Sequence, residues 1–251
     1  MKNLYIIGDS HSVRMGQGLF DNIIKKMSIS EPYSIYTTEG IDKLLKKDDE
    51  GNPIRQKHEV RTINFKNRSI TCASYLGRSA LRFDYKLNRY MNFWDDEDST
   101  VMPWLGYIDV KNYLPNKKLK KYVPVHDVVD TYVENTLKSF KKSKLIFINP
   151  MPQFEVIVTA RWKNFSVDPD IPFEDRHEEH LLFSKALKEK CLSVGLEEPI
   201  MIEKILNVPW IGTTMQYKTP LEYIYNDHCT PEYYDRILEH ILDHTGFNIG
   251  P

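Results

Sequence analysis

Short apolar runs alternate along the chain with longer segments in which apolar residues recur every three or four positions. The short runs have the length of buried strands, and they lie at residues 4–7, 101–110 and 144–148. The longer segments have the periodicity of helices with one buried face, and they lie at residues 13–27, 125–140 and 173–194. Because strands that alternate with helices build a mostly parallel sheet, we expect a three-layer, flavodoxin-like α/β fold with helices on both faces of the sheet.

Further signals complete this outline. The β-prone runs at residues 60–65 and 69–75 flank a short polar turn and predict a hairpin, which we interpret as a local insertion. Residues 199–203 predict the last strand, and a terminal helix is expected from Pro231. We expect one domain over residues 1–251, with insertions near 40–70 and 90–125.

Composition narrows the class of protein. The chain has 251 residues, of which 41% are hydrophobic and 27% charged, an ordinary globular balance. Lys and Arg number 34 and Asp and Glu 35, so the net charge of −1 provides no overall field to attract nucleic acid or an anionic membrane. No apolar run approaches the roughly 20 residues that span a bilayer. The three cysteines match neither a disulfide framework nor a zinc site, which favours a cytoplasmic location.

The sequence GDSHS at residues 8–12 lies where the first strand gives way to the first helix. A serine there sits at the carboxyl end of a parallel strand and beside a helix N-terminus, whose free N–H groups stabilise developing negative charge. Ser10 is therefore a candidate nucleophile. The alternative is that Ser10 or Ser12 only caps the helix, since serine is a favoured N-cap residue.

A histidine in a loop before the terminal helix provides the second candidate. It is His228, within DHCTPE at residues 227–232. A neutral imidazole near pH 7 can accept a proton from a serine hydroxyl and return it to a leaving group. Cys229 is an alternative nucleophile, but neighbouring side chains in an extended chain point to opposite sides, which favours a structural thiol.

Together these segments resemble the first and last motifs of the SGNH (GDSL-type) hydrolase family. SYLGRSALRF at residues 74–83 is similar to the second block of that family, and WLGYIDVKNYL at residues 104–114 resembles the G-E-I-D-x-R form of its third block, in a subgroup that also begins with GDSH. The resemblance implies that Ser10 attacks an ester carbonyl, that His228 acts as base, and that the N–H groups of Ser10 and Gly77 hold the oxyanion. It adds four candidate residues for the oxyanion and substrate side of the site: Asp9, His11, Asp109 and Lys111.

The chain departs from the family pattern at three positions, of which one is Lys111, where the variant form has an arginine. Ile108 stands where better-known members carry an asparagine that donates to the oxyanion, and an apolar side chain cannot donate. Tyr225 stands where the family usually has an aspartate three residues before the histidine. Either Asp227 orients the imidazole of His228 through a tight turn, or a Ser–His dyad works with a backbone carbonyl or another acid.

The resemblance implies a serine esterase that cleaves a small ester, with an O-acetyl group on a sugar or glycan as the favoured substrate. Two alternatives belong to other classes: a non-catalytic carbohydrate-binding or assembly module, and an O-acyltransferase that uses the same serine. Neither a phosphate loop nor a dinucleotide fingerprint is present, so no cofactor is expected. The sequence HEEH at residues 177–180 lacks a third metal ligand, and we interpret it as a solvated helix face.

Overall fold

The structure, a computed structural model, describes residues 2–9, 12, 15, 34–47, 53–64, 67–75, 80, 95–115, 123–152, 171–206 and 231–247. The strands of this part of the chain are β1 (Asn3–Gly8), β2 (Ser34–Lys47), β3 (Pro53–Asn64), β4 (Ser69–Tyr75), β5 (Ser99–Trp104) and β6 (Lys144–Leu145). Its helices are α3 (Val125–Ser139), α4 (Phe173–Ser193), α5 (Ile202–Leu206), α6 (Pro231–Thr245) and the short π-helix η5 (Asp109–Tyr113).

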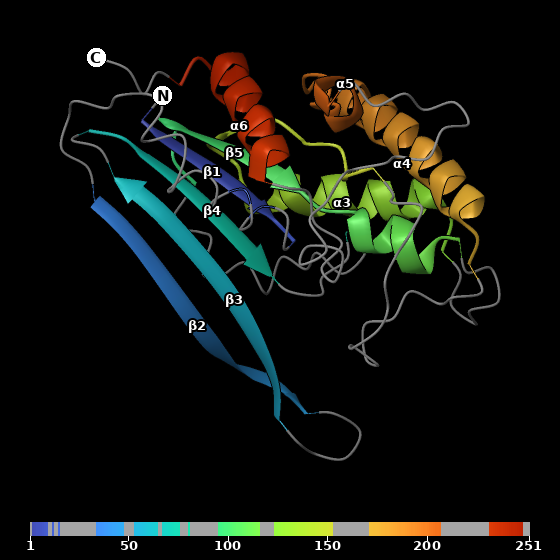
Figure 1. The fold of residues 1–251 in the computed structure, drawn as a ribbon, viewed down its shortest axis with the longest axis horizontal. Coiled ribbons are helices and arrows are strands. Elements are labelled where there is room, and N and C mark those ends of the chain that lie inside the picture. Colours follow the sequence, from blue (N-terminus) through green and yellow to red (C-terminus); the bar gives the residue numbers. More distant parts are fainter. Residues whose placement is uncertain are drawn as a thin grey trace.

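The six strands form one sheet in the order β2-β3-β4-β1-β5-β6. All pairings from β4 to β6 are parallel, whereas β2 pairs with β3, and β3 with β4, in antiparallel fashion. The long β2–β3 hairpin projects from one side of the molecule (Figure 1). The core of the sheet is therefore parallel, as the alternation of strands and helices predicts.

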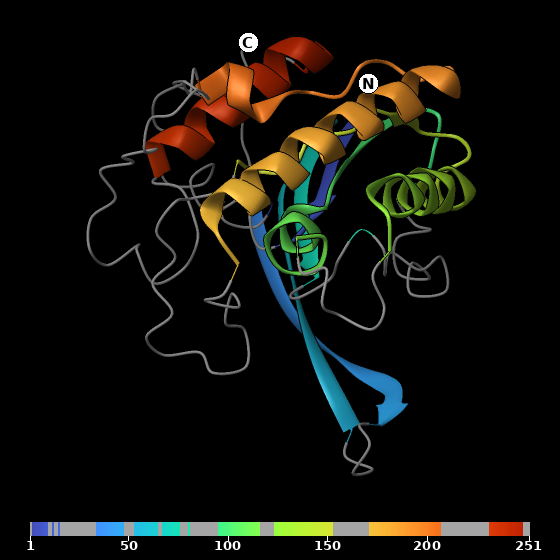
Figure 2. The ribbon, with the colours of Figure 1, turned by 90° about the vertical axis from the view of Figure 1, so that its right-hand side faces the viewer.

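Side chains of β1 alternate between the two faces of the sheet. Leu4 and Ile6 belong to a hydrophobic cluster with residues of α5 and α6, whereas Tyr5 and Ile7 belong to a second cluster with residues of α3 and α4. This alternation follows from the two-residue period of a strand, and the burial of both faces is typical of parallel sheets. Helices on both sides of the sheet (Figure 2) confirm the predicted three-layer α/β architecture.

The predicted helices agree well with the structure where it describes them. The segments 125–140 and 173–194 correspond to α3 and α4, and the terminal helix begins at Pro231. Gly195, directly after α4, has φ +80°, the left-handed conformation that ends many helices. Of the helix expected at residues 13–27, only Met15 is described, and it is helical.

Three sequence predictions require correction. The hairpin between β3 and β4 exists, but β4 is no insertion: its residues are buried on both faces, and it pairs with β1 at the centre of the sheet. The strand expected at 101–110 ends at Trp104. The last strand, expected at 199–203, is reduced to a single bridge between Ile200 and Ile148. It stops there because the carbonyl of Met201 accepts the N–H groups of Lys204 and Ile205 and so begins α5.

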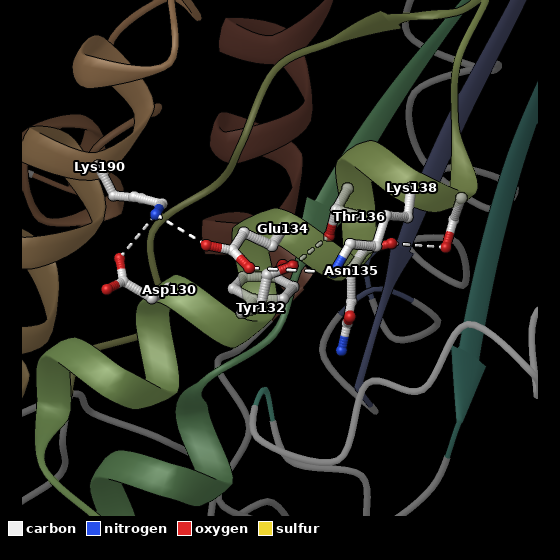
Figure 3. A network of polar contacts seen from close by, with 8 residues as sticks. Asp130, Tyr132, Glu134, Asn135, Thr136, Lys138 and Lys190 are labelled. Carbon is white, nitrogen blue, oxygen red and sulfur yellow. Dashed lines mark hydrogen bonds and ion pairs between the residues drawn. The ribbon is translucent and has the colours of Figure 1, made fainter.

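Contacts between α3 and α4 fix the helical layer on one face. Lys190 of α4 lies between two carboxylates of α3, 3.0 Å from Asp130 and 3.2 Å from Glu134 (Figure 3). Below them, the ring of Tyr132 meets Phe147 edge-on, with 5.2 Å between centroids. None of the helices in the described part of the chain has the length and apolar character that a bilayer crossing requires.

Candidate active site

The carboxyl ends of β1, β4 and β5 lie side by side at one edge of the sheet (Figure 1). In the parallel register, Gly8 at the end of β1 is level with Ser74 of β4 and Trp104 of β5. The chain that follows Gly8 therefore leaves the sheet between two neighbouring strand ends. This is the edge at which open α/β sheets bind their ligands.

Close backbone approach explains why the turn after β1 begins with glycine. A Cβ atom on Gly8 would overlap the backbone carbonyl oxygen of Trp104. The next residue, Asp9, donates its N–H to that same oxygen at 3.3 Å and is 3% exposed. A larger residue at position 8 would push the start of the turn away from β5.

Ser12 holds the turn from the other side. Its hydroxyl oxygen lies 2.7 Å from the carbonyl oxygen of Ala73 in β4 and 2.8 Å from that of Asp9, and the side chain is fully buried. This hydroxyl is committed to structural hydrogen bonds between the turn and β4. Of the two serines in GDSHS, Ser12 thus has the structural role, which leaves Ser10 as the candidate nucleophile.

The chain after β5 supplies a buried carboxylate. Asp109 begins η5, is 1% exposed, and accepts a hydrogen bond from the backbone N–H of Ala80. Its own carbonyl accepts the N–H of Leu114 at 2.9 Å, the i to i+5 bond of a π-helix. Short π-helical turns often occur at functional sites. Ile108, which precedes Asp109, has no polar side-chain group to offer.

Lys111 and Tyr132 lie buried close to the same segment. Lys111 is 5% exposed, and its ammonium nitrogen lies 5.7 Å from the centroid of the Tyr107 ring, a cation–π arrangement. The phenol oxygen of Tyr132 accepts the N–H of Leu105 at 3.1 Å. Burial raises the pKa of Tyr132 well above its usual value, and the charges of Asp9 and Asp109 contribute to the same shift. The phenol therefore stays protonated.

The interpretation of HEEH as a solvated face is wrong for half of its residues. Glu179 is 6% exposed and His180 is fully buried. The neighbouring Arg176 is also buried, with 3% of its surface exposed. The reason is that α4 packs against both α3 and η5, so the helical stripe that contains these residues faces inward. Burial lowers the pKa of His180 to about 3, with a smaller contribution from His177, and the imidazole is neutral.

Asn149 is a polar residue at the same sheet edge that sequence reasoning passed over. It is fully buried and donates to the hydroxyl of Ser184 in α4 at 2.9 Å and to a carboxylate oxygen of Glu203 in α5 at 3.0 Å. Burial raises the pKa of Glu203. The available signal was the abrupt end of the apolar run 144–148 at Asn149 and Pro150, although the predicted strand 144–148 is wrong in length, since β6 ends at Leu145 and Ile148 forms only a single bridge with Ile200.

Several predicted residues lie outside the described part of the chain: Ser10, His11, Gly77, Asp227, His228 and Cys229. The helix that follows His228 is described. Tyr234, in the first turn of α6, belongs to the same hydrophobic cluster as Met15 and Trp104, which flank the turn after β1. Within the described residues, no group of three His, Cys, Asp or Glu side chains could hold a metal ion.

A groove of about 670 Å³ lies elsewhere, between the segment 198–205 and α6. Its lining includes Ile200 and Ile205, together with charged groups of both signs, among them Lys204, Arg236 and Asp243. It contains none of the predicted site residues, so we place the candidate site at the strand ends.

Comparisons with known proteins support the fold. No protein-family profile matches the sequence, and a search of curated proteins finds no match. Among solved structures, Axe2, an acetylxylan esterase from Geobacillus stearothermophilus, is similar over 100% of this chain and 96% of its own, with a TM-score of 0.52 and 12% identity. Est24, a carbohydrate acetylesterase from Sinorhizobium meliloti, is similar over 98% of this chain and 99% of its own, with a TM-score of 0.51 and 11% identity.

An aryl esterase from M. smegmatis is similar over 98% of this chain and 99% of its own, with a TM-score of 0.50 and 10% identity. At such identities the likeness concerns the fold alone. The chain therefore has the three-layer α/β fold in which esterases occur.

Proposed function

We propose that the protein is a serine esterase of the SGNH type. It removes a small acyl group, with acetyl as the favoured group, from a hydroxyl oxygen of a sugar or glycan. The observation that carries this proposal is the turn after β1. Gly8 lies against the end of β5, and the hydroxyl of Ser12 bonds to the carbonyl of Ala73 in β4, so the described residues on both sides of Ser10 in the sequence are held at neighbouring strand ends. The esterase activity of proteins with this fold supports the same reaction class.

In the proposed mechanism, the hydroxyl oxygen of Ser10 attacks the ester carbonyl while His228 takes its proton. Backbone N–H groups of Ser10 and Gly77 stabilise the negative charge that develops on the carbonyl oxygen. His228 then protonates the departing sugar oxygen as the C–O bond between that oxygen and the acyl carbon breaks, so the sugar leaves with a free hydroxyl and the acyl group stays on Ser10. Water, activated by the same imidazole, attacks the acyl-enzyme and releases the free acid, which restores Ser10.

Five further residues complete the proposed site. Asp227, or another acid, orients His228 on the side away from Ser10. His11 and Lys111 lie on the substrate side, next to Ser10 and in η5 respectively. The burial of Asp9 and Asp109 favours a supporting position for both carboxylates. The proposed enzyme acts as a single domain in the cytoplasm and requires no cofactor.

The test compares the parent protein with Ser10→Ala. We expect hydrolysis of p-nitrophenyl acetate, release of acetate from a peracetylated sugar, and covalent labelling by a fluorophosphonate probe in the parent, and the loss of all three in the variant. Ser193→Ala, at an exposed position on α4, is the matched control and keeps all three. Equal labelling and turnover in the parent and Ser10→Ala would reject the esterase and favour a non-catalytic carbohydrate-binding module.

A further inference from the structure

Asp109 makes a contact that joins two of the sequence segments assigned to the site. Its carboxylate accepts the backbone N–H of Ala80, and both residues are buried, with 1% and 0% of their surface exposed. Ala80 follows Gly77, the proposed oxyanion donor, by three positions. Hydrogen bonds to an ionised acceptor are about twice as strong as those between neutral groups. The contact is therefore a strong constraint on the segment that contains Gly77.

The position of Asp109 is itself fixed from several sides. The N–H of Val110 donates to the carbonyl of Gly106 at 2.9 Å, and the carbonyl of Asp109 accepts the N–H of Leu114. Gly106 is wedged between Phe183 of α4 and Pro150, since a Cβ atom there would come within 2.7 Å of each. The carboxylate consequently sits on a backbone that has little freedom to move.

The other end of the same segment is fixed by the sheet. β4 ends at Tyr75, which pairs with His58 of β3, and Ser74 pairs with Gly8 of β1. Tyr75 and Ala80, the described residues on either side of residues 76–79, are thus anchored by β3 and by Asp109 respectively. Gly77 lies between the two anchors in the sequence, and Gly8 directly precedes the turn that carries Ser10.

We propose that Asp109 is a positioning residue of the esterase site, because it holds Ala80, three positions after the proposed oxyanion donor Gly77 in the sequence. This inference rests on the proposed function. Oxyanion stabilisation depends on donors placed before the reaction begins, and a misplacement of about 1 Å can lower the rate by about 100-fold. Since Ile108 supplies no side-chain donor, correct placement of the backbone donor matters more in this chain.

The experiment replaces Asp109 by asparagine and by leucine. Asparagine keeps an oxygen that accepts the Ala80 N–H but loses the charge, and leucine loses both. We expect kcat for p-nitrophenyl acetate to fall about tenfold or more in Asp109→Asn and further in Asp109→Leu, with KM within about twofold of the parent. The affinity for a boronate that mimics the tetrahedral intermediate should fall in parallel with kcat.

Asp95 offers a matched control at the opposite edge of the sheet. Its carboxylate accepts the backbone N–H groups of Lys141, Lys142 and Ser143 at 2.9 to 3.0 Å. Asp95→Asn makes the same chemical change and should lower stability while kcat stays at the parent value. This comparison separates a local effect on the site from a general loss of stability.

Three outcomes decide the proposal. If kcat of Asp109→Asn stays within about twofold of the parent, or if its KM rises as much as its kcat falls, Asp109 is not a positioning residue. If Asp109→Leu fails to fold, the comparison of Asp109→Asn with Asp95→Asn decides alone. Ser10→Ala is assayed in parallel: equal rates in that variant and the parent reject the esterase itself, whereas a Ser10-dependent parent with a fully active Asp109→Asn rejects only the positioning role.

Discussion

His180 is a neutral imidazole inside the protein, and this makes stability depend on pH. Burial lowers its pKa from 6.5 to about 3, so between these values the unfolded chain binds a proton that the native protein does not. The contribution of neutral His180 to the free energy of unfolding is therefore fully present above pH 6.5, and it is lost as the pH falls toward 3. We expect the free energy of unfolding to decrease by up to about 1.4 kcal/mol per pH unit from this residue alone.

Urea unfolding at several pH values tests this expectation. His180→Gln cannot take up the proton, so its free energy of unfolding should fall less steeply with acidification than that of the parent. Ser193→Gln, at an exposed position on α4, introduces the same side chain without removing a titratable group and is the control, which should keep the slope of the parent. Parallel curves for the parent and His180→Gln would contradict the neutral buried state.

Gly106 is a position where the backbone demands glycine. Its φ is +112°, and a Cβ atom would lie 2.7 Å from Phe183 and from Pro150. Gly106→Ala should therefore lower the free energy of unfolding by about 2–4 kcal/mol, through backbone strain and overpacking together. Gly195→Ala, with φ +80° but open space around the Cβ position, should lose only about 1 kcal/mol. Equal losses in the two variants would show that packing at Gly106 is unimportant.

Single residues differ in how far sequence alone reveals their role. GDSHS marks the edge of the sheet, because a turn directly after a buried parallel strand lies where α/β sheets bind their ligands. The structural role of Ser12, which distinguishes it from the candidate nucleophile Ser10, is evident only from its hydrogen bond to the carbonyl of Ala73, far along the chain. The burial of Glu179 and His180 is not evident from the sequence, since charged side chains seldom face a protein interior. The buried face of α4 that carries these residues is recognised only from the packing of α4 against α3 and η5.

At the scale of elements, Tyr132 matters more than the ion pairs that join α3 to α4. Its buried phenol oxygen is the acceptor for the N–H of Leu105, directly after β5. Tyr132→Phe leaves this N–H without that acceptor and should cost about 1–3 kcal/mol of stability. Lys190→Met removes both ion pairs of Figure 3, whose carboxylates are half exposed, and should cost at most about 1 kcal/mol.

Thermal or urea unfolding in low and high salt distinguishes the two contributions. The effect of Lys190→Met should shrink as salt screens the exposed charges, whereas that of Tyr132→Phe should not change. A larger loss in Lys190→Met than in Tyr132→Phe would contradict this ranking.

Elements with strong periodicity are predictable from the sequence, and elements defined by their neighbours are not. The sequence locates α3, α4 and α6 within about two residues. The helices α3 and α6 carry an apolar stripe, whereas in α4 only the second half of the buried face is mainly apolar. The central place of β4 escapes sequence reasoning, since its Ser, Thr and Ala residues resemble a solvent-exposed strand although it lies between β1 and β3. The shortening of the last strand depends on the capping role of Met201, which no local pattern indicates.

On the scale of the whole molecule, the proposed chemistry requires that opposite ends of the chain meet. β1 ends beside β5, and Tyr234 in the first turn of α6 belongs to the hydrophobic cluster that also contains Trp104 at the end of β5. Sequence motifs name Ser10 and His228, but the proposed cooperation between them depends on the folded molecule.

A double-mutant cycle measures this cooperation directly. Residues that act as one unit lose nearly all of their contribution when either is removed, so Ser10→Ala and His228→Ala should each lower kcat by about 10⁴-fold or more, and the double variant no further. Independent residues would instead show effects that multiply. If His228→Ala keeps the rate of the parent while Ser10→Ala abolishes it, the base lies elsewhere on the sheet edge, and the remaining buried acids and histidines there become the residues to replace next.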